Sequence, residues 1–195
     1  MSNLLSINTY VFTIVLLVLV CYFLYRHIRG YDKRIATMAF DGKEYLVRDI
    51  PSRVATADAL ARLNRAIKIL IDYMEKSSHP DFVLSVKRLK NRYNSDAISE
   101  GHVTDAGITS YTLNKGEEIV FCMRTRDNEE QLYEDNVLMY VAMHELAHVM
   151  TISEQHTSEF HTNFRYLQEC ARKLKLFEGI NKSTNYCGID LKPQH

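Results

Sequence analysis

The stretch HELAHVMTISEQH, residues 144–156, places three histidines and two glutamates within thirteen residues. His144 and His148 are four residues apart, and the flanking sequences VLMYVAM and LAHVM are apolar. This pattern predicts a buried helix over about 136–151, on which the two histidines project from the same face. Two imidazoles so placed can bind one Zn²⁺, so the spacing H-E-x-x-H predicts a zinc site.

The glutamate of this motif, Glu145, follows the first histidine directly. It can therefore face the open coordination position of a metal without binding the metal itself. A general base that activates water must stand at that position. The competing interpretation is an ordinary core helix whose histidines are satisfied by neighbouring carbonyl groups, since buried polar groups need partners.

A catalytic zinc takes three protein ligands and one open site, so a third ligand is expected from outside the helix. His156 is the preferred candidate, because the chain can leave the helix near Thr151 and return within a short turn. His161 is a second candidate, and a carboxylate from Glu154 or Glu159 is a third.

The remaining sequence predicts one small α+β domain over residues 31–195. Apolar residues recur at helical spacing in three further segments, which we expect to be helices over 55–76, 80–93 and 158–177. Residues 40–50 read as a strand, and 94–107 read as a loop without a clear period. Two β-rich runs flank Asn-Lys-Gly-Glu at 114–117, a signal for a hairpin turn.

The N-terminal residues 1–30 predict a membrane anchor. Residues 7–25, INTYVFTIVLLVLVCYFLY, carry no charged side chain and are long enough to span a bilayer as a helix. Arg26, Arg29, Lys33 and Arg34 follow this span, and no basic residue precedes it. The positive-inside rule then predicts a single-pass membrane protein with its C-terminal domain facing the cytosol.

Charge and cysteine content bound the remaining possibilities. The 24 acidic and 24 basic residues give a formal net charge of zero, so no broad basic field is available for direct contact with nucleic acid. Outside the predicted span lie Cys122, Cys170 and Cys187, an odd number at wide spacing without a CxxC pair. Neither a zinc ribbon nor a disulfide framework is indicated, and a reducing compartment fits.

The sequence resembles the WLM and SprT-like zinc metallopeptidases, in which a helix carries H-E-x-x-H and the third ligand begins an H-x-x-x-F segment. His156-Thr-Ser-Glu-Phe160 matches that segment. The chain is more similar still to small metallopeptidases of large DNA viruses, over roughly 44–190. The stretches that carry this likeness are YLVRDIP, SYTLNKGEEIVFCMR, VAMHELAHVM, HTSEFHTNFRYL and NYCGID.

The resemblance implies a zincin fold with a small, mainly antiparallel sheet, whose edge strand receives extended peptide. EEIVFCMR, residues 117–124, is the expected edge strand. The implied activity is hydrolysis of peptide bonds in a protein or peptide substrate, with His144, His148 and His156 holding Zn²⁺ and Glu145 acting as general base. Tyr111 is a candidate donor to the oxyanion.

Two other functions stay open at this point. One is a membrane-tethered interaction or virion protein in which zinc only stabilises the fold, and a fourth ligand such as His161 or Glu159 would favour it. The other is proteolysis associated with DNA, which the SprT-like resemblance suggests.

Overall fold

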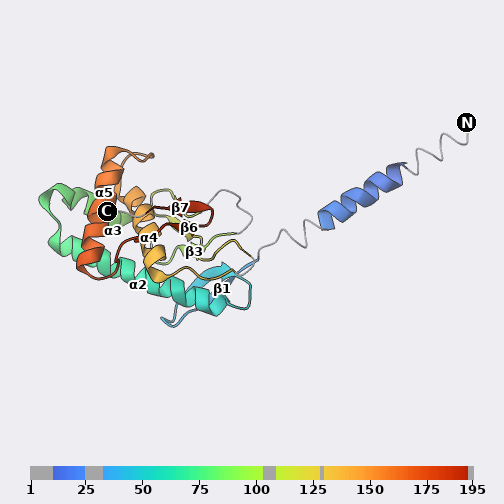
Figure 1. Cartoon of the computed structure of the whole chain (residues 1–195), viewed down its shortest axis with the longest axis horizontal. Helices are drawn as coiled ribbons and strands as arrows, with labels where there is room; N and C mark the ends of the chain where they lie inside the picture. Colours follow the sequence, from blue (N-terminus) through green and yellow to red (C-terminus); the bar gives the residue numbers. More distant parts are fainter. Residues whose placement is uncertain (1–10, 25–32, 103–108, 128–129, 193–195) are drawn as a thin grey trace, which may run out of the picture. The chain divides into compact units, whose positions relative to one another are not determined.

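The computed structural model describes residues 11–24, 33–102, 109–127 and 130–192 (Figure 1). The chain divides into two compact units, Met1–Lys33 and Arg34–His195. The first contains one described helix, and the second contains the sheet, the other helices and the histidines of the predicted zinc site.

The N-terminal unit does not support the predicted membrane anchor. Residues 11–24 are helical. Among the described residues, no helix is both long and apolar enough to span a membrane. The prediction of a single-pass protein anchored through residues 7–25 is therefore wrong; residues 7–10 and 25 lie outside the described part.

The second unit is built on a five-stranded sheet with the order β1-β2-β3-β5-β4. The strands are β1 (Arg34–Met38), β2 (Glu44–Arg48), β3 (Ile98–Glu100), β4 (Tyr111–Leu113) and β5 (Glu118–Phe121). Two antiparallel pairs, β1 with β2 and β4 with β5, flank β3, which pairs parallel with both β2 and β5. The fold is thus mixed α/β, and most residue pairs of the sheet are antiparallel, with β3 as the strand that departs from the predicted antiparallel pattern.

Strand β4 is the edge strand next to the predicted zinc helix, so the prediction that 117–124 forms this edge is wrong. The central part of 117–124 is β5, which pairs with β3 on one side and with β4 on the other. Ile119, Val120 and Phe121 are buried, as expected of an interior strand. The hairpin was predicted in the right place, but β3 covers the far side of β5 and leaves β4 outermost.

The helices of the second unit pack against one another, and α2 (Arg53–Ser77) and α4 (Asp135–Met150) lie next to the strands (Figure 1). The others are the 3-10 turn η1 (Pro80–Phe82), α3 (Val83–Arg92) and α5 (Ser158–Lys173). Helix α2 packs on β1, β2 and β3, while α4 contacts α2, α3, α5 and β4. The four predicted helices are confirmed, although α5 ends earlier than expected and Lys175 beyond it has a left-handed φ of 57°.

Helix α4 is the centre of the core. From Val137 to Met150 every residue is buried except Tyr140, His144 and His148, which are half-buried. These three are four residues apart, so they lie on one face of the helix. A helix that is apolar on almost all sides is expected to be enclosed by the protein, and here its single open face carries both motif histidines.

A small hairpin near the C-terminus, β6 (Thr184–Tyr186) and β7 (Ile189–Leu191), is joined covalently to the sheet. Cys187 in its turn forms a disulfide with Cys122, which follows β5, and the two Cα atoms are 6.5 Å apart. The sequence did not indicate a disulfide, and this expectation is wrong. Of the described cysteines, Cys21 and Cys170 remain free.

Removing this disulfide is expected to destabilise the domain. The bond closes a loop between residues 65 apart in sequence, and such a cross-link stabilises by about 2–4 kcal/mol because it restricts the unfolded chain. Denaturant unfolding of a Cys122→Ala/Cys187→Ala variant should show a lower midpoint and a free energy of unfolding smaller by that amount. Cys170→Ala, which removes a buried cysteine without a cross-link, is the matched control. An unchanged midpoint in the double variant would contradict the pairing.

Candidate metal centre

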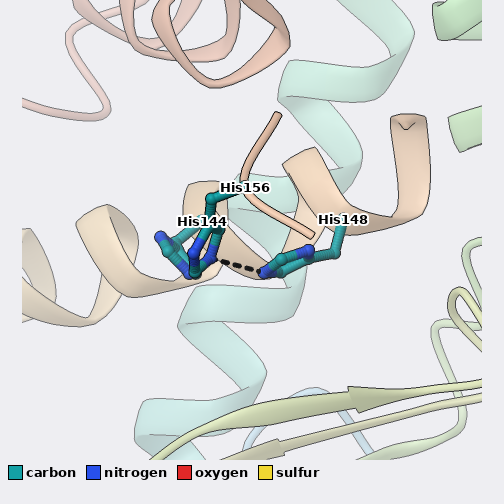
Figure 2. A group of neighbouring side chains, drawn as sticks. All are labelled: His144, His148 and His156. Carbon is teal, nitrogen blue, oxygen red and sulfur yellow. Dashed lines mark hydrogen bonds between the residues drawn. The ribbon is translucent and has the colours of Figure 1, made fainter. Parts of the chain in front are cut away.

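Three histidine rings converge at the open face of α4 (Figure 2). His144 and His148 come from the helix, and His156 comes from the loop between α4 and α5. The Nε2 atom of His156 lies 3.1 Å from Nε2 of His144 and 3.1 Å from Nε2 of His148. One ligand atom from each residue lies within 4.8 Å of the others, so the three could hold one metal ion.

Hydrogen bonding alone does not explain this arrangement. The Nε2 atom of a neutral imidazole carries either one proton or one lone pair, so Nε2 of His156 cannot form a full hydrogen bond with both neighbours at once. Nitrogen ligands about 2.0–2.1 Å from a tetrahedral zinc are about 3.3 Å apart. The separation of 3.1 Å is close to that value. The three imidazoles therefore fit a zinc ion.

The two helix histidines are held in the protonation state that binds metal. Burial lowers the pKa of His144 to about 4, and the neighbouring histidines act in the same direction. Burial is also the main reason why the pKa of His148 is lowered to about 4, and the charge of His156 is the next largest cause. Neutral imidazole is the form that coordinates a metal, so neither side chain must lose a proton at neutral pH.

Phe160 supports the three rings from within the protein. It is 1% exposed, and its ring centroid lies 4.9 Å from that of His144 and 4.5 Å from those of His148 and His156. Phe160 stands on the first turn of α5. The H-x-x-x-F spacing thus places the apolar ring of Phe160 against the ring of His156, the histidine with which this segment begins.

The loop that carries His156 is fixed by charged side chains of two helices. Arg88 of α3 donates from Nε to the carbonyl of Met150 at 2.8 Å and from Nη2 to Glu159 at 2.8 Å. Glu159 in turn accepts from the backbone N–H of Ile152 at 3.2 Å. Lys115, in the turn between β4 and β5, donates to the carbonyl of Ser153. Glu159 therefore orients the loop and does not join the histidine cluster.

Replacing Arg88 with alanine is expected to weaken zinc binding without unfolding the domain. The loop would lose the guanidinium that fixes its start, and outer partners of metal ligands typically contribute about 10–100-fold in affinity. Competition with a chromogenic chelator should show a dissociation constant raised by about tenfold or more. Lys90→Ala, on the same helix but paired with Glu75, is the control. Equal affinity in wild type and Arg88→Ala would contradict this role.

Glu145 lies beside the cluster and points toward the edge strand. It is 5% exposed, and Oγ1 of Thr112 on β4 donates to its Oε2 at 2.9 Å. Burial raises the pKa of Glu145 to about 7, against the opposing effect of this hydrogen bond. A carboxyl group with a pKa near the working pH can both accept and return a proton.

The histidines and Glu145 open into a cleft of about 460 Å³. Its walls are Thr109–Thr112 with the turn residues Asn114 and Lys115, then His144, Glu145 and His148 of α4, Glu154 and His156 of the loop, and Ile189 of β7. Strand β4 thus borders the cleft with the edge that no other described strand covers. Such an edge can pair with an extended peptide.

The other candidates from the sequence have different places. His161 is exposed, and its ring centroid is 6.4 Å from that of His156; it is not part of the cluster that could hold a metal. Tyr111 lines the cleft, and its role as an oxyanion donor stays a prediction. Sequence reasoning missed Thr112 and Arg88, since neither belongs to a motif and both act through contacts far apart in sequence.

Comparison with known proteins agrees with this geometry. The family model of the WLM domain matches residues 47–194. Uncharacterized protein R325 of Acanthamoeba polyphaga mimivirus is 31% identical over 152 residues, which cover 75% of this chain and 76% of the viral protein. Uncharacterized protein 042R of Invertebrate iridescent virus 3 is 48% identical over 82 residues, covering 41% of this chain and 50% of that protein. The predicted resemblance to the WLM family and to viral proteins is confirmed.

The fold is similar to a solved structure as well. Wss1 from Saccharomyces cerevisiae superposes with a TM-score of 0.51 at 16% identity, covering 66% of this chain and 87% of Wss1. At this identity the likeness concerns the fold.

Proposed function

We propose that this chain, which belongs to the WLM domain family, is a zinc-dependent peptidase that hydrolyses peptide bonds in extended segments of protein. The observation that carries the proposal is the convergence of three imidazoles and one buried carboxyl group in an open cleft beside an edge strand. The family is zinc-dependent in general, which supports the choice of metal.

Each residue then has a distinct task. His144, His148 and His156 would hold Zn²⁺, which when bound polarises a carbonyl group and makes water a better nucleophile. Glu145 accepts the proton of the attacking water and returns it to the leaving amine. Thr112 keeps one oxygen of Glu145 in place through its hydrogen bond. The backbone of β4 pairs with the substrate and holds it extended across α4.

The arrangement favours catalysis over a zinc that only stabilises the fold. A structural site is usually closed by four protein ligands, whereas a catalytic one keeps a position open. Within the described residues, three ligands form the cluster, and Glu159 is engaged by Arg88. A buried glutamate beside the cluster also has no task in a purely structural site.

Protein is the substrate class that we propose, without direct contact to nucleic acid. The formal net charge is zero, so the counterion release that drives binding to phosphate backbones is weak. Proteolysis near DNA would then need a partner that binds the DNA.

The test is hydrolysis of an unfolded protein, such as reduced and alkylated casein, by the full chain. Protein stripped of metal should be inactive, and one equivalent of zinc should restore cleavage. Mass spectrometry in ¹⁸O-labelled water should find the label in the new carboxyl termini. Absence of new termini with the zinc-loaded protein would refute the proposal.

A further inference from the structure

A second cavity, of about 130 Å³, opens beside the proposed catalytic residues. It shares His144 and Glu145 with the main cleft, so it begins where the scissile bond would lie. It also shares Thr109, Ser110 and Ile189 with that cleft. The rest of its wall is mostly apolar and consists of Tyr140 and Val141 of α4, Tyr186 of β6 and Leu191 of β7. This cavity is a side pocket of the cleft.

Two hydroxyl groups of this wall are already engaged with each other. The hydroxyl groups of Tyr186 and Ser110 are 2.6 Å apart. Ser110 also accepts the backbone N–H of Cys122 at 3.1 Å. A polar side chain entering the pocket would lose its water and displace these bonds, which costs free energy. An apolar side chain would gain by leaving water.

The side pocket is held in shape before any ligand arrives. Its outer wall is the β6–β7 hairpin, which the Cys122–Cys187 disulfide ties to the end of β5. The backbone N–H of Cys187 donates to the hydroxyl of Tyr133 at 2.8 Å, and the Tyr186 hydroxyl bonds to Ser110. A preformed pocket binds more tightly because little ordering is needed on binding.

We infer that this side pocket selects substrates with an aliphatic side chain, such as leucine, isoleucine or methionine, on a residue adjoining the scissile bond. The inference rests on the proposed peptidase function and adds a preference to it. The cavity of about 130 Å³ is large enough to admit a branched aliphatic side chain. Leu191 and Val141 would contact that side chain from opposite elements, β7 and α4.

The test uses three peptide hydroxamates that differ only in the side chain next to the metal-binding group: leucine, its isostere asparagine, and glycine. Calorimetry on the zinc-loaded full chain measures binding without requiring turnover. The leucine probe is expected to bind about tenfold or more tightly than the asparagine or glycine probe. Equal affinities for leucine and asparagine would overturn the inference.

Variants of Leu191 assign the preference to the side pocket. Leu191→Trp, which fills the space, should bring the leucine probe to within about threefold of the glycine probe. Leu191→Ala, which enlarges the space, should weaken binding of the leucine probe and leave binding of the glycine probe unchanged. This variant tests the inference if Leu191→Trp does not fold. Leu84→Trp, at an exposed position of α3, should keep the wild-type preference.

The outcomes separate this inference from the proposed function. A leucine preference that persists in folded Leu191 variants would place selection elsewhere and overturn the inference alone. If the zinc-loaded protein bound none of the three hydroxamates, the open metal site itself would be refuted, and the inference would fall with it.

Discussion

Replacing Glu145 with glutamine is expected to lower kcat for peptide hydrolysis by about 10²–10⁴-fold, the usual contribution of a general base. Glutamine keeps the size of the side chain and can still contact Thr112, but it cannot accept a proton from water. Zinc content should stay at the wild-type level, because Glu145 is not one of the three residues that form the cluster. Initial rates of casein cleavage, together with zinc analysis of the same samples, measure both effects.

Glu169→Gln is the control, since it makes the same change at an exposed position of α5. It should cleave at the wild-type rate. Wild-type turnover in Glu145→Gln would remove this residue from its proposed role. Loss of zinc in that variant would instead make Glu145 a ligand.

Replacing His156 with alanine is the second change with a large expected effect. The free energy of zinc binding at a site with four ligands is about 10–16 kcal/mol. One ligand therefore accounts for about 3–4 kcal/mol, which is about 10²–10³-fold in affinity. His156 lies on an exposed loop and outside the core, so its loss should leave the fold intact. Chelator competition should therefore find much weaker zinc binding in a protein with an unchanged circular dichroism spectrum.

His161→Ala separates the two candidates for the third ligand. His161 lies outside the cluster, so zinc affinity should remain within about twofold of wild type in this variant. If instead His161→Ala lost zinc and His156→Ala kept it, the assignment of the third ligand would be reversed.

The centre of the fold could be predicted because its signals are local. Apolar flanks on both sides of His144 and His148 predict a buried helix, and α4 is that helix, with the two histidines on its one open face. The short loop and the H-x-x-x-F spacing favoured His156, and the structure brings it to the other two. That these three bind zinc remains a prediction.

The parts that could not be predicted depend on distant pairings. Strand β3 has three residues, too few for an alternating pattern, yet its parallel pairing with β2 and β5 decides which strand lies at the edge. The disulfide joins Cys122 to Cys187, in a hairpin that the sequence did not reveal. The hydrogen bond from Thr112 to Glu145 likewise follows only from the position of β4.

The N-terminal error has a different origin. That prediction rested on the length and apolar composition of residues 7–25 and on the basic residues that follow them. The described helix there is 11–24, and among the described residues no helix meets both requirements of a membrane span, length and apolar content.

The most direct test of the account is the zinc content of the full chain, purified without chelators and measured by elemental analysis. We predict about one zinc per chain in the wild type and in Glu145→Gln, and less than about a tenth of that in a His144→Ala/His148→Ala variant. A wild-type protein without zinc, which also binds none when zinc is supplied, would contradict the account, because the three histidines would then be structural.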